Sequence, residues 1–232
     1  MFRADLKRSW DAMKFAPLLI ATTAGLAAAQ RLARVIAITH ANVRGVTTLI
    51  AFVLLLVTIG FYGAQRFWLD AAFRRESFSL GDAASQTRKC FGRFVALGLT
   101  VVVCAIPAFF VAVFIDIANS VAARAVFILI TYAIDVILTF VVPALALTTT
   151  SVRRSFAISR RVLTQTGRAS AWYRFAPGIA LLGLAEVLPT SSALGGLSVA
   201  LAMLTSLVAL WFKGAILGFY LRVAHADGVD IQ

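Results

Sequence analysis

The chain has 232 residues, of which 61% are hydrophobic and only 14% are charged, and its mean hydropathy is +0.90. A soluble domain of this length needs more polar surface, so the composition excludes an ordinary soluble protein. The net charge of +12 is concentrated between long apolar runs, where the positive-inside rule explains it, and we therefore expect no nucleic-acid ligand.

The apolar residues form continuous runs that are long enough to cross a bilayer. A transmembrane barrel would need alternating strands of about ten residues instead. We therefore predict an all-α polytopic membrane protein with about six transmembrane helices, forming a single integral membrane domain over residues 1–232. The predicted spans cover residues 17–38, 46–68, 94–115, 125–147, 175–188 and 197–222.

Residues 1–16 precede the first span and predict an amphipathic interface helix. Phe2, Leu6, Trp10 and Met13 recur every three or four residues, while the basic side chains face elsewhere. Tryptophan and basic residues together suit the cytoplasmic surface of a membrane, so we expect this helix to lie there.

The first predicted span permits two interpretations. Its clean apolar run covers only residues 18–29, and together with the basic start it also resembles a secretory signal peptide. The basic region is long for a signal peptide and contains Asp5 and Asp11, so we favour an uncleaved helix. Both interpretations bring the chain outside near His40, and the later topology is the same.

The second span and the loop after it carry local signals. The span is expected to close with Arg66, and Phe67 and Trp68 are expected to anchor it at the membrane interface. Ser79 and Asp82, three residues apart, fit a capping box, so a helix is predicted to begin there and to run into the third span.

Lysine and arginine counts set the predicted orientation. The N-terminal helix and residues 70–93 and 151–174 are rich in both, whereas the other loops are poor in them. The positive-inside rule therefore places both termini of this multi-pass membrane protein on the cytoplasmic side.

Two ionisable residues lie deep within predicted spans. Asp135 is about halfway along the fourth span, and Lys213 lies in the sixth at a similar depth. Hydrocarbon penalises an unpaired charge, so we predict that the two form an intramembrane charge pair. A structural ion pair between the two spans and a transport or proton-relay role both remain open.

A second group of charged residues lies near the predicted outer face. It could line an outward vestibule, although ordinary interfacial charge is the interpretation we favour. This candidate outer polar cluster contains Arg31, Arg34, Asp116 and Glu186, with Arg124 nearby.

The inner segment over residues 151–175 contains six arginines and no acid. Helical projection places Phe156 and Leu163 on one side and two pairs of arginines, two turns apart, on the other. Such a helix is predicted to lie flat at the cytoplasmic interface and to contact anionic lipid headgroups or a partner subunit. The proposed contact residues are Arg153, Arg154, Arg160 and Arg161.

The chain contains no recognised catalytic motif. There is no metalloprotease, nucleophile-elbow or phosphate-binding glycine signature, so we predict no catalytic, cofactor-binding or metal-ligating residues and no enzymatic activity. The two histidines, His40 and His225, fall on opposite predicted sides of the membrane. Cys90 and Cys104 are too far apart on one helix to form a disulfide.

Several segments resemble a loosely defined group of bacterial proteins. They are VVPALAL, RRSFAISRRVLTQT and WYRF in residues 141–175, and SFSLGDAASQTRKCFGRF in the earlier inner loop. The pattern is similar to that of six-helix inner-membrane proteins that include the membrane domain attached to some glycerophosphodiester phosphodiesterases. The resemblance implies the fold and the membrane location; the catalytic domain of those enzymes has no counterpart here.

Two functional hypotheses follow. The first is a non-enzymatic integral membrane subunit or accessory protein in bacterial envelope or transport processes. The alternative is the permease subunit of a transporter driven by a separate ATPase. Both predict a protein partner, which is a membrane subunit in the first case and a cytoplasmic ATPase in the second.

Overall fold

The computed structural model describes residues 1–39, 44–118, 120–187 and 195–226, and every regular element in these ranges is a helix. The all-α class is therefore confirmed for the described part of the chain. The elements are α1 (Phe2–Phe15), α2 (Pro17–Thr39), α3 (Arg44–Arg74), α4 (Leu80–Ala118), α5 (Ser120–Leu138), α6 (Val141–Leu147), α7 (Val152–Thr166), the 3₁₀ turn η2 (Gly167–Ser170), α8 (Ala171–Val187) and α9 (Gly195–Ala226).

Three of the described segments are long and apolar enough to cross a membrane, namely Gly45–Arg74, Leu80–Pro107 and Gly196–Ala224. A fourth is possible if α1 and α2, which meet at an angle of 92°, count as one broken span. These helices support a membrane protein. A helix lies within each of the six predicted ranges, but the six-span topology remains a prediction.

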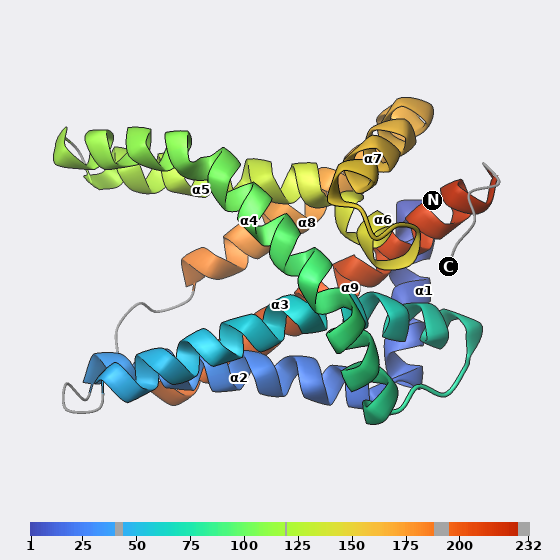
Figure 1. Ribbon diagram of the computed structural model, residues 1–232, viewed down its shortest axis with the longest axis horizontal. Coiled ribbons are helices and arrows are strands. Elements are labelled where there is room, and N and C mark those ends of the chain that lie inside the picture. Colours follow the sequence, from blue (N-terminus) through green and yellow to red (C-terminus); the bar gives the residue numbers. More distant parts are fainter. Residues whose placement is uncertain (40–43, 119, 188–194, 227–232) are drawn as a thin grey trace.

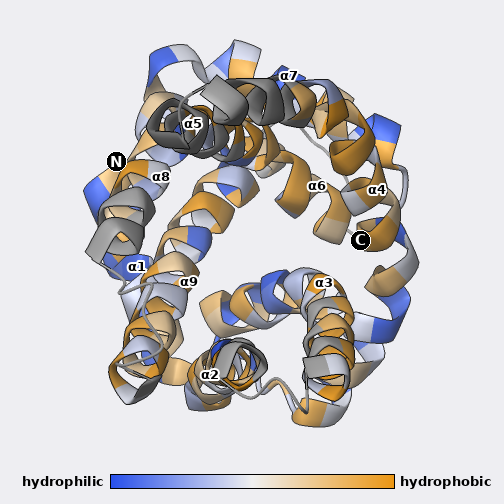
Figure 2. Ribbon diagram, turned by 90° about the vertical axis from the view of Figure 1, so that its left-hand side faces the viewer, coloured by the Kyte–Doolittle hydropathy of each residue, from blue (hydrophilic) through white to orange (hydrophobic). Residues whose placement is uncertain are grey.

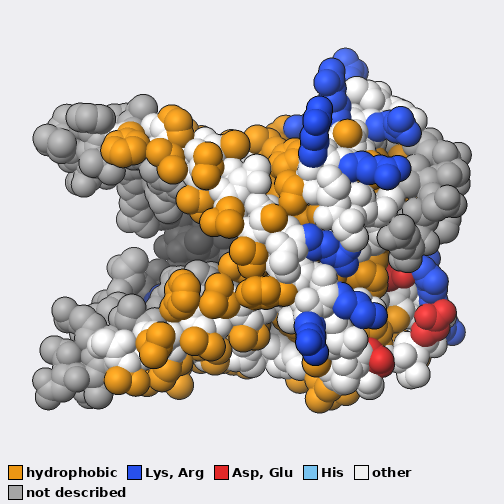
Figure 3. All heavy atoms as spheres, in the orientation of Figure 1, with side chains coloured by type: hydrophobic (Ala, Val, Ile, Leu, Met, Phe, Trp, Pro, Cys, Tyr) orange, Lys and Arg blue, Asp and Glu red, His pale blue; other side chains and the backbone are white. Residues whose placement is uncertain are grey.

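The helices form two groups that diverge from a common base (Figure 1). The base is the end of the molecule that contains α1, α6 and α7. In one group α2 packs against α3 and α9; in the other α5 packs against α4 and α8. Contacts of α3 with α4 and of α8 with α9 join the groups. Viewed along the groups, the helices form a ring with α9 beside α8 (Figure 2). Lysine and arginine side chains gather at the base, and hydrophobic side chains cover the diverging groups (Figure 3).

The N-terminal helix docks on α9 through a face of small and polar side chains. Ser9 is fully buried, and its hydroxyl donates to the Trp211 carbonyl oxygen at 2.7 Å. The Trp211 indole N–H in turn donates to the Leu6 carbonyl oxygen at 2.7 Å. Gly214 permits this approach, because a methyl group there would come within 2.0 Å of Ser9 Oγ. Trp10 of the predicted apolar face is instead 47% exposed.

The inner end of the second predicted span differs from the expectation. Trp68 is 2% exposed, so its side chain faces the protein and does not anchor the span among lipid headgroups as predicted, whereas Phe67 is half-buried. Arg66 is 5% exposed. The ring of Trp68 packs on Phe78 with 5.3 Å between the centroids. The physical reason is that α3 continues beyond Trp68 to Arg74 and has α1, α4, α6 and α9 packed against it.

The turn after α3 carries its own stop signal. The Glu76 N–H donates to the Ala71 oxygen at 2.9 Å and the Arg75 N–H donates to the Ala72 oxygen at 3.2 Å. This pair of bonds is a Schellman motif, which requires a left-handed residue, and Arg75 takes that position with φ of 59°.

The capping box that begins α4 is confirmed. The Ser79 N–H donates to Asp82 Oδ2 at 2.9 Å, and the Asp82 N–H donates to Ser79 Oγ at 3.1 Å. From there α4 runs without a break through Pro107. Cys90 and Cys104 both lie on it as free thiols.

The fourth predicted range is interrupted rather than continuous. α5 ends at Leu138, and α6 begins at Val141 after a turn at Thr139 and Phe140. Pro143 explains the break, because its ring would clash with the carbonyl of residue 139 in an unbroken helix, whereas it is tolerated in the first turn of α6.

Substitution of Gly214 tests the docking of α1. We expect Gly214→Ala to destabilise the protein by about 1–3 kcal/mol, because the methyl group must displace Ser9. The matched control is Gly98→Ala in α4, where nothing lies within 4 Å of the added group. Thermal unfolding in detergent measures both, and equal melting temperatures for the two variants would contradict the close approach.

Candidate functional site

A cavity of about 140 Å³ lies where the two helix groups meet. Its walls come from α3, α5, α8 and α9, and α6 contributes Val142. Four charged side chains line it, which are Arg66, Arg174, Lys213 and Asp135. The wall thus carries three cations and one carboxylate, and apart from Thr139 the remaining lining is apolar or aromatic.

α3 supplies an arginine and the ring that supports it. Tyr62 and Arg66 are one helical turn apart, and Arg66 Cζ lies 5.1 Å from the centroid of the Tyr62 ring. Arg66 is only 5% exposed, yet its Nε and Nη1 find no hydrogen-bond partner among the described residues. Two donors of this buried guanidinium are thus unsatisfied by the described residues.

α9 supplies the lysine on the same ring. Lys213 Nζ lies 3.8 Å from the Tyr62 ring centroid, so one aromatic ring supports two cations. The ammonium also donates to Gln65 Oε1 at 3.3 Å, and Gln65 Nε2 donates to Thr23 Oγ1 of α2 at 3.1 Å. This chain of bonds fixes the position of the lysine across α2, α3 and α9.

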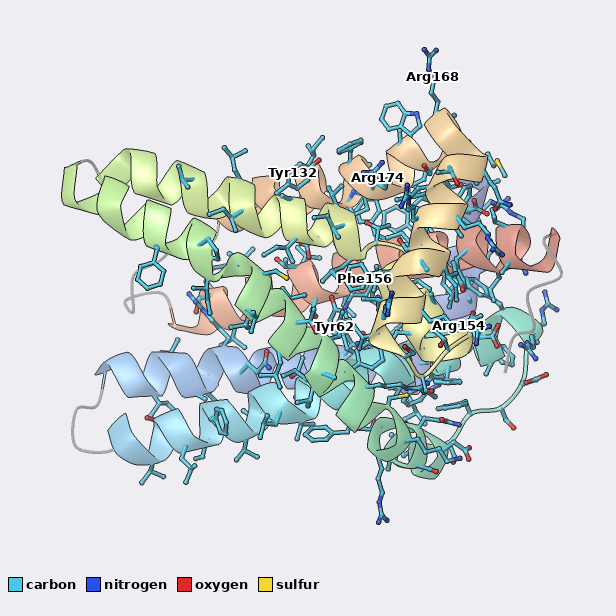
Figure 4. All side chains as sticks on the ribbon, turned by 45° about the horizontal axis from the view of Figure 1, so that its top comes forward. Tyr62, Tyr132, Arg154, Phe156, Arg168 and Arg174 are labelled. Carbon is cyan, nitrogen blue, oxygen red and sulfur yellow. The ribbon has the colours of Figure 1, made fainter. Side chains whose placement is uncertain are left out.

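α5 and α8 close the other side of the cavity. The two helices approach closely at Gly178, where a methyl group would come within 2.1 Å of the Tyr132 ring. This approach brings Asp135 of α5 and Arg174 of α8 to one wall. Figure 4 shows Tyr62 and Arg174 among the helices, whereas Arg168 projects away from them. Arg174 Nε has no hydrogen-bond partner among the described residues.

The predicted partners Asp135 and Lys213 line the same cavity and interact electrostatically. They are not in direct contact, since no carboxylate of the described residues comes within 4.0 Å of the Lys213 ammonium, which bonds to Gln65 instead. Their role as a functional or structural pair stays a prediction.

The other predicted site residues lie elsewhere. All four arginines of the α7 prediction, Arg153, Arg154, Arg160 and Arg161, are exposed, while Ser155, Ser159 and Val162 are buried on the opposite side. Ser151 caps the start of α7, and Gly167, with φ of 48°, ends it. In the outer cluster Arg31 is half-buried on α2. The side chains of Arg34, Asp116, Arg124, Glu186, His40 and His225 lie outside the described part of the chain.

A second polar cluster joins α1 to α8 and α9 beside the cavity. Asp5 of α1 is 2% exposed and accepts hydrogen bonds from the Tyr173 hydroxyl and from Arg222 Nη2 of α9. Burial and the hydrogen bond to Asp5 raise the pKa of Tyr173, which keeps its hydroxyl a donor. Tyr173 also lines the cavity, so the cluster positions one of its walls.

Sequence analysis missed Tyr62, Gln65, Arg66 and Arg174 as site residues. A signal was present for the first three, because spacings of three and four place them on one face of a single helix. Nothing in the local sequence indicates that Arg174 meets them.

This arrangement can hold an anion. Arg66 is buried and Arg174 and Lys213 are half-buried. Cations at such positions can supply charge-assisted hydrogen bonds, and the apolar lining lowers the local dielectric and strengthens them. No group of three or more histidine, cysteine, aspartate or glutamate side chains suited to a metal ion occurs in the part of the chain that the structure describes.

The chain matches no known protein-family model, no curated protein and no solved structure.

The buried Asp5 cluster can be tested with Tyr173→Phe. We expect a loss of about 1.5–3 kcal/mol, typical of a hydrogen bond to a charged group. Because the pKa of Tyr173 is raised above its ordinary value of 10.0, its stabilising contribution is full below pH 10.0 and is lost as the pH rises through the raised value. Thermal unfolding of wild type and variant as a function of pH measures the difference.

The control is Tyr132→Phe, since the Tyr132 hydroxyl makes only a 3.4 Å bond to the Phe175 oxygen. If the two substitutions are equally mild below pH 10.0, the cluster does not hold α1 in place.

Proposed function

We propose that the protein is a non-enzymatic integral membrane subunit that binds an anion in the cavity between its two helix groups and serves bacterial envelope or transport processes. In this proposal it crosses the inner membrane six times, with both termini in the cytoplasm. The observation that carries the proposal is the wall of three cations against one carboxylate, with two donors of the buried Arg66 unpartnered among the described residues.

The free-energy cost of burying positive charge supports an anionic ligand. A buried cation without a counter-charge is costly in an apolar environment, and the cost is larger where two cations lie on one ring. In the described part of the chain no carboxylate lies within 4.0 Å of Arg66 or Lys213. An anion between them would offset this cost, so the arrangement of charges favours binding of an anion.

The place of the cavity favours the permease alternative over a purely accessory role. It lies where two diverging helix groups meet, and alternating access in many transporters is a rocking of two such groups around a fixed site (Figure 1). An ATPase partner would then dock at the base, where α1 and α7 carry basic side chains. The resemblance to the glycerophosphodiester phosphodiesterase membrane domain is consistent with such a membrane role and remains a prediction.

Exposed arginines on α7 support contact with anionic lipid or a partner. All four point away from the buried face of the helix, and basic groups near an anionic membrane surface contribute about 1 kcal/mol each. We propose that α7 lies along the cytoplasmic interface and makes that contact.

Charge-altering variants test anion binding in the cavity. We expect Lys213→Met to weaken anion binding by on the order of tenfold or more, because one nearby positive charge is lost in a medium of low dielectric. Asp135→Asn serves as the matched control of opposite sign and is expected to strengthen binding by a similar factor. Microcalorimetry with purified full-length protein measures both, and no change in either variant would contradict the site.

Removing the α7 charges tests the interface contact. Replacing Arg153, Arg154, Arg160 and Arg161 with glutamine is expected to reduce co-purification of anionic lipid or of a partner subunit while leaving membrane insertion intact. The matched control removes four exposed charges elsewhere at the base, at Arg74, Arg75, Arg88 and Lys89. If both quadruple variants lose the same amount of lipid or partner, α7 is only part of a general positive surface.

A co-purified cytoplasmic ATPase in stoichiometric amount would support the permease, and a membrane partner without an ATPase would support the accessory role. Flux of an anion into liposomes that contain the purified protein alone would contradict the accessory role.

A further inference from the structure

The charges around the cavity define more than an affinity for anions in general. Arg66, Arg174 and Lys213 together with Asp135 give the wall a formal charge of +2 when all four groups are ionised, that is three positive charges less one negative. A monovalent anion would leave one positive charge uncompensated within the bundle. A dianion balances the wall, because its charge of −2 equals the excess.

The three cations that line the cavity come from different helices. Arg66 of α3 has Nε and Nη1 without partners among the described residues, and Arg174 of α8 has Nε in the same state. Lys213 of α9 adds an ammonium with three protons, of which one is donated to Gln65. Donors that come from three helices suit a tetrahedral anion, whose oxygens point in several directions, better than a planar carboxylate.

The size of the cavity agrees with this geometry. A volume of about 140 Å³ has room for several water-sized groups, and therefore for a phosphorus atom with its oxygens. Arginine is the side chain most often used for phosphate recognition, and lysine binds phosphate as a point charge. Tyr62 interacts with two of the cations through its ring, which offsets part of their mutual repulsion.

We infer that the cavity binds a dianionic phosphate group, carried either by a membrane lipid or by a water-soluble compound. This inference rests on the proposed anion-binding function. A phosphate monoester carries about 1.5 to 2 negative charges near neutral pH, so it supplies the charge that the wall lacks. A lipid and a water-soluble compound would both be recognised through the phosphate group, and they differ in the chemical group that is attached to it.

The test compares probes that differ in charge and in source. Full-length protein, purified in detergent and freed of lipid, is titrated at pH 8 with inorganic phosphate and with acetate. The same protein in lipid nanodiscs is then compared in phosphatidylcholine alone and in phosphatidylcholine with phosphatidic acid. Binding is read from calorimetry and from the rise in melting temperature, because a ligand that binds only the folded state stabilises it.

We expect phosphate or phosphatidic acid to bind at least tenfold more tightly than acetate. Arg66→Met should reduce that binding at least tenfold, and this variant is expected to fold, since an apolar side chain replaces an uncompensated buried cation. Arg66→Lys keeps the charge with fewer donors and should bind phosphate more weakly than wild type. The matched control Arg88→Gln removes an exposed arginine of α4 and should bind as wild type does.

The outcomes test the inference of a dianionic ligand separately from the anion-binding function. Preference for inorganic phosphate identifies a water-soluble source, and a response to phosphatidic acid alone identifies a lipid. If acetate binds as tightly as phosphate, the site accepts anions but the dianion inference is overturned. If neither probe nor lipid binds, or if Arg66→Met leaves binding unchanged, the anion-binding function itself is contradicted.

Discussion

Two cations share one aromatic ring inside the helix bundle, and the described residues place no carboxylate beside either of them. Arg66 and Lys213 flank Tyr62, although like charges in an apolar environment repel each other strongly. Tertiary structure imposes this arrangement, because α3 and α9 are held at fixed positions by the bonds from Lys213 to Gln65 and from Gln65 to Thr23. The cavity, its excess charge and its proposed ligand all depend on this constraint.

The N-terminal helix α1 stabilises the positions of Arg66 and Lys213 from outside the cavity. Asp5 of α1 accepts hydrogen bonds from Arg222 of α9 and from Tyr173, so its charge compensates Arg222 and is not available to the cavity. The contact of Ser9 with Trp211 and the close approach at Gly214 hold α1 against α9. α1 is thus part of the packed protein as well as a surface element, and its loss would change the shape of the cavity wall.

The sequence predicted the class of the fold because that information is local. Hydrophobic runs mark helices, and the capping box at Ser79 and Asp82 was found from its spacing alone. The burial of Trp68 was not predicted, because it depends on which neighbour a helix meets. The break before Pro143 was also not predicted, although the proline was a local signal for it. Asp135 and Lys213 were identified from their charge within apolar runs.

The rest of the site could not be found in the same way. Tyr62 and Arg66 had a recognisable spacing, but only the position of α9 shows that Lys213 lies over the same ring. Arg174 reaches the cavity because α5 and α8 approach at Gly178, which is a tertiary event. The direct ion pair expected between Asp135 and Lys213 is replaced in the structure by a shared cavity wall.

An experimental structure of the full-length protein, determined in the presence of phosphate, tests the central claim most directly. The proposed site predicts density for an anion within hydrogen-bond distance of Arg66 and Lys213, with Asp135 remaining apart from the lysine. A direct ion pair of Lys213 with Asp135, in a closed cavity without an anion, would contradict it.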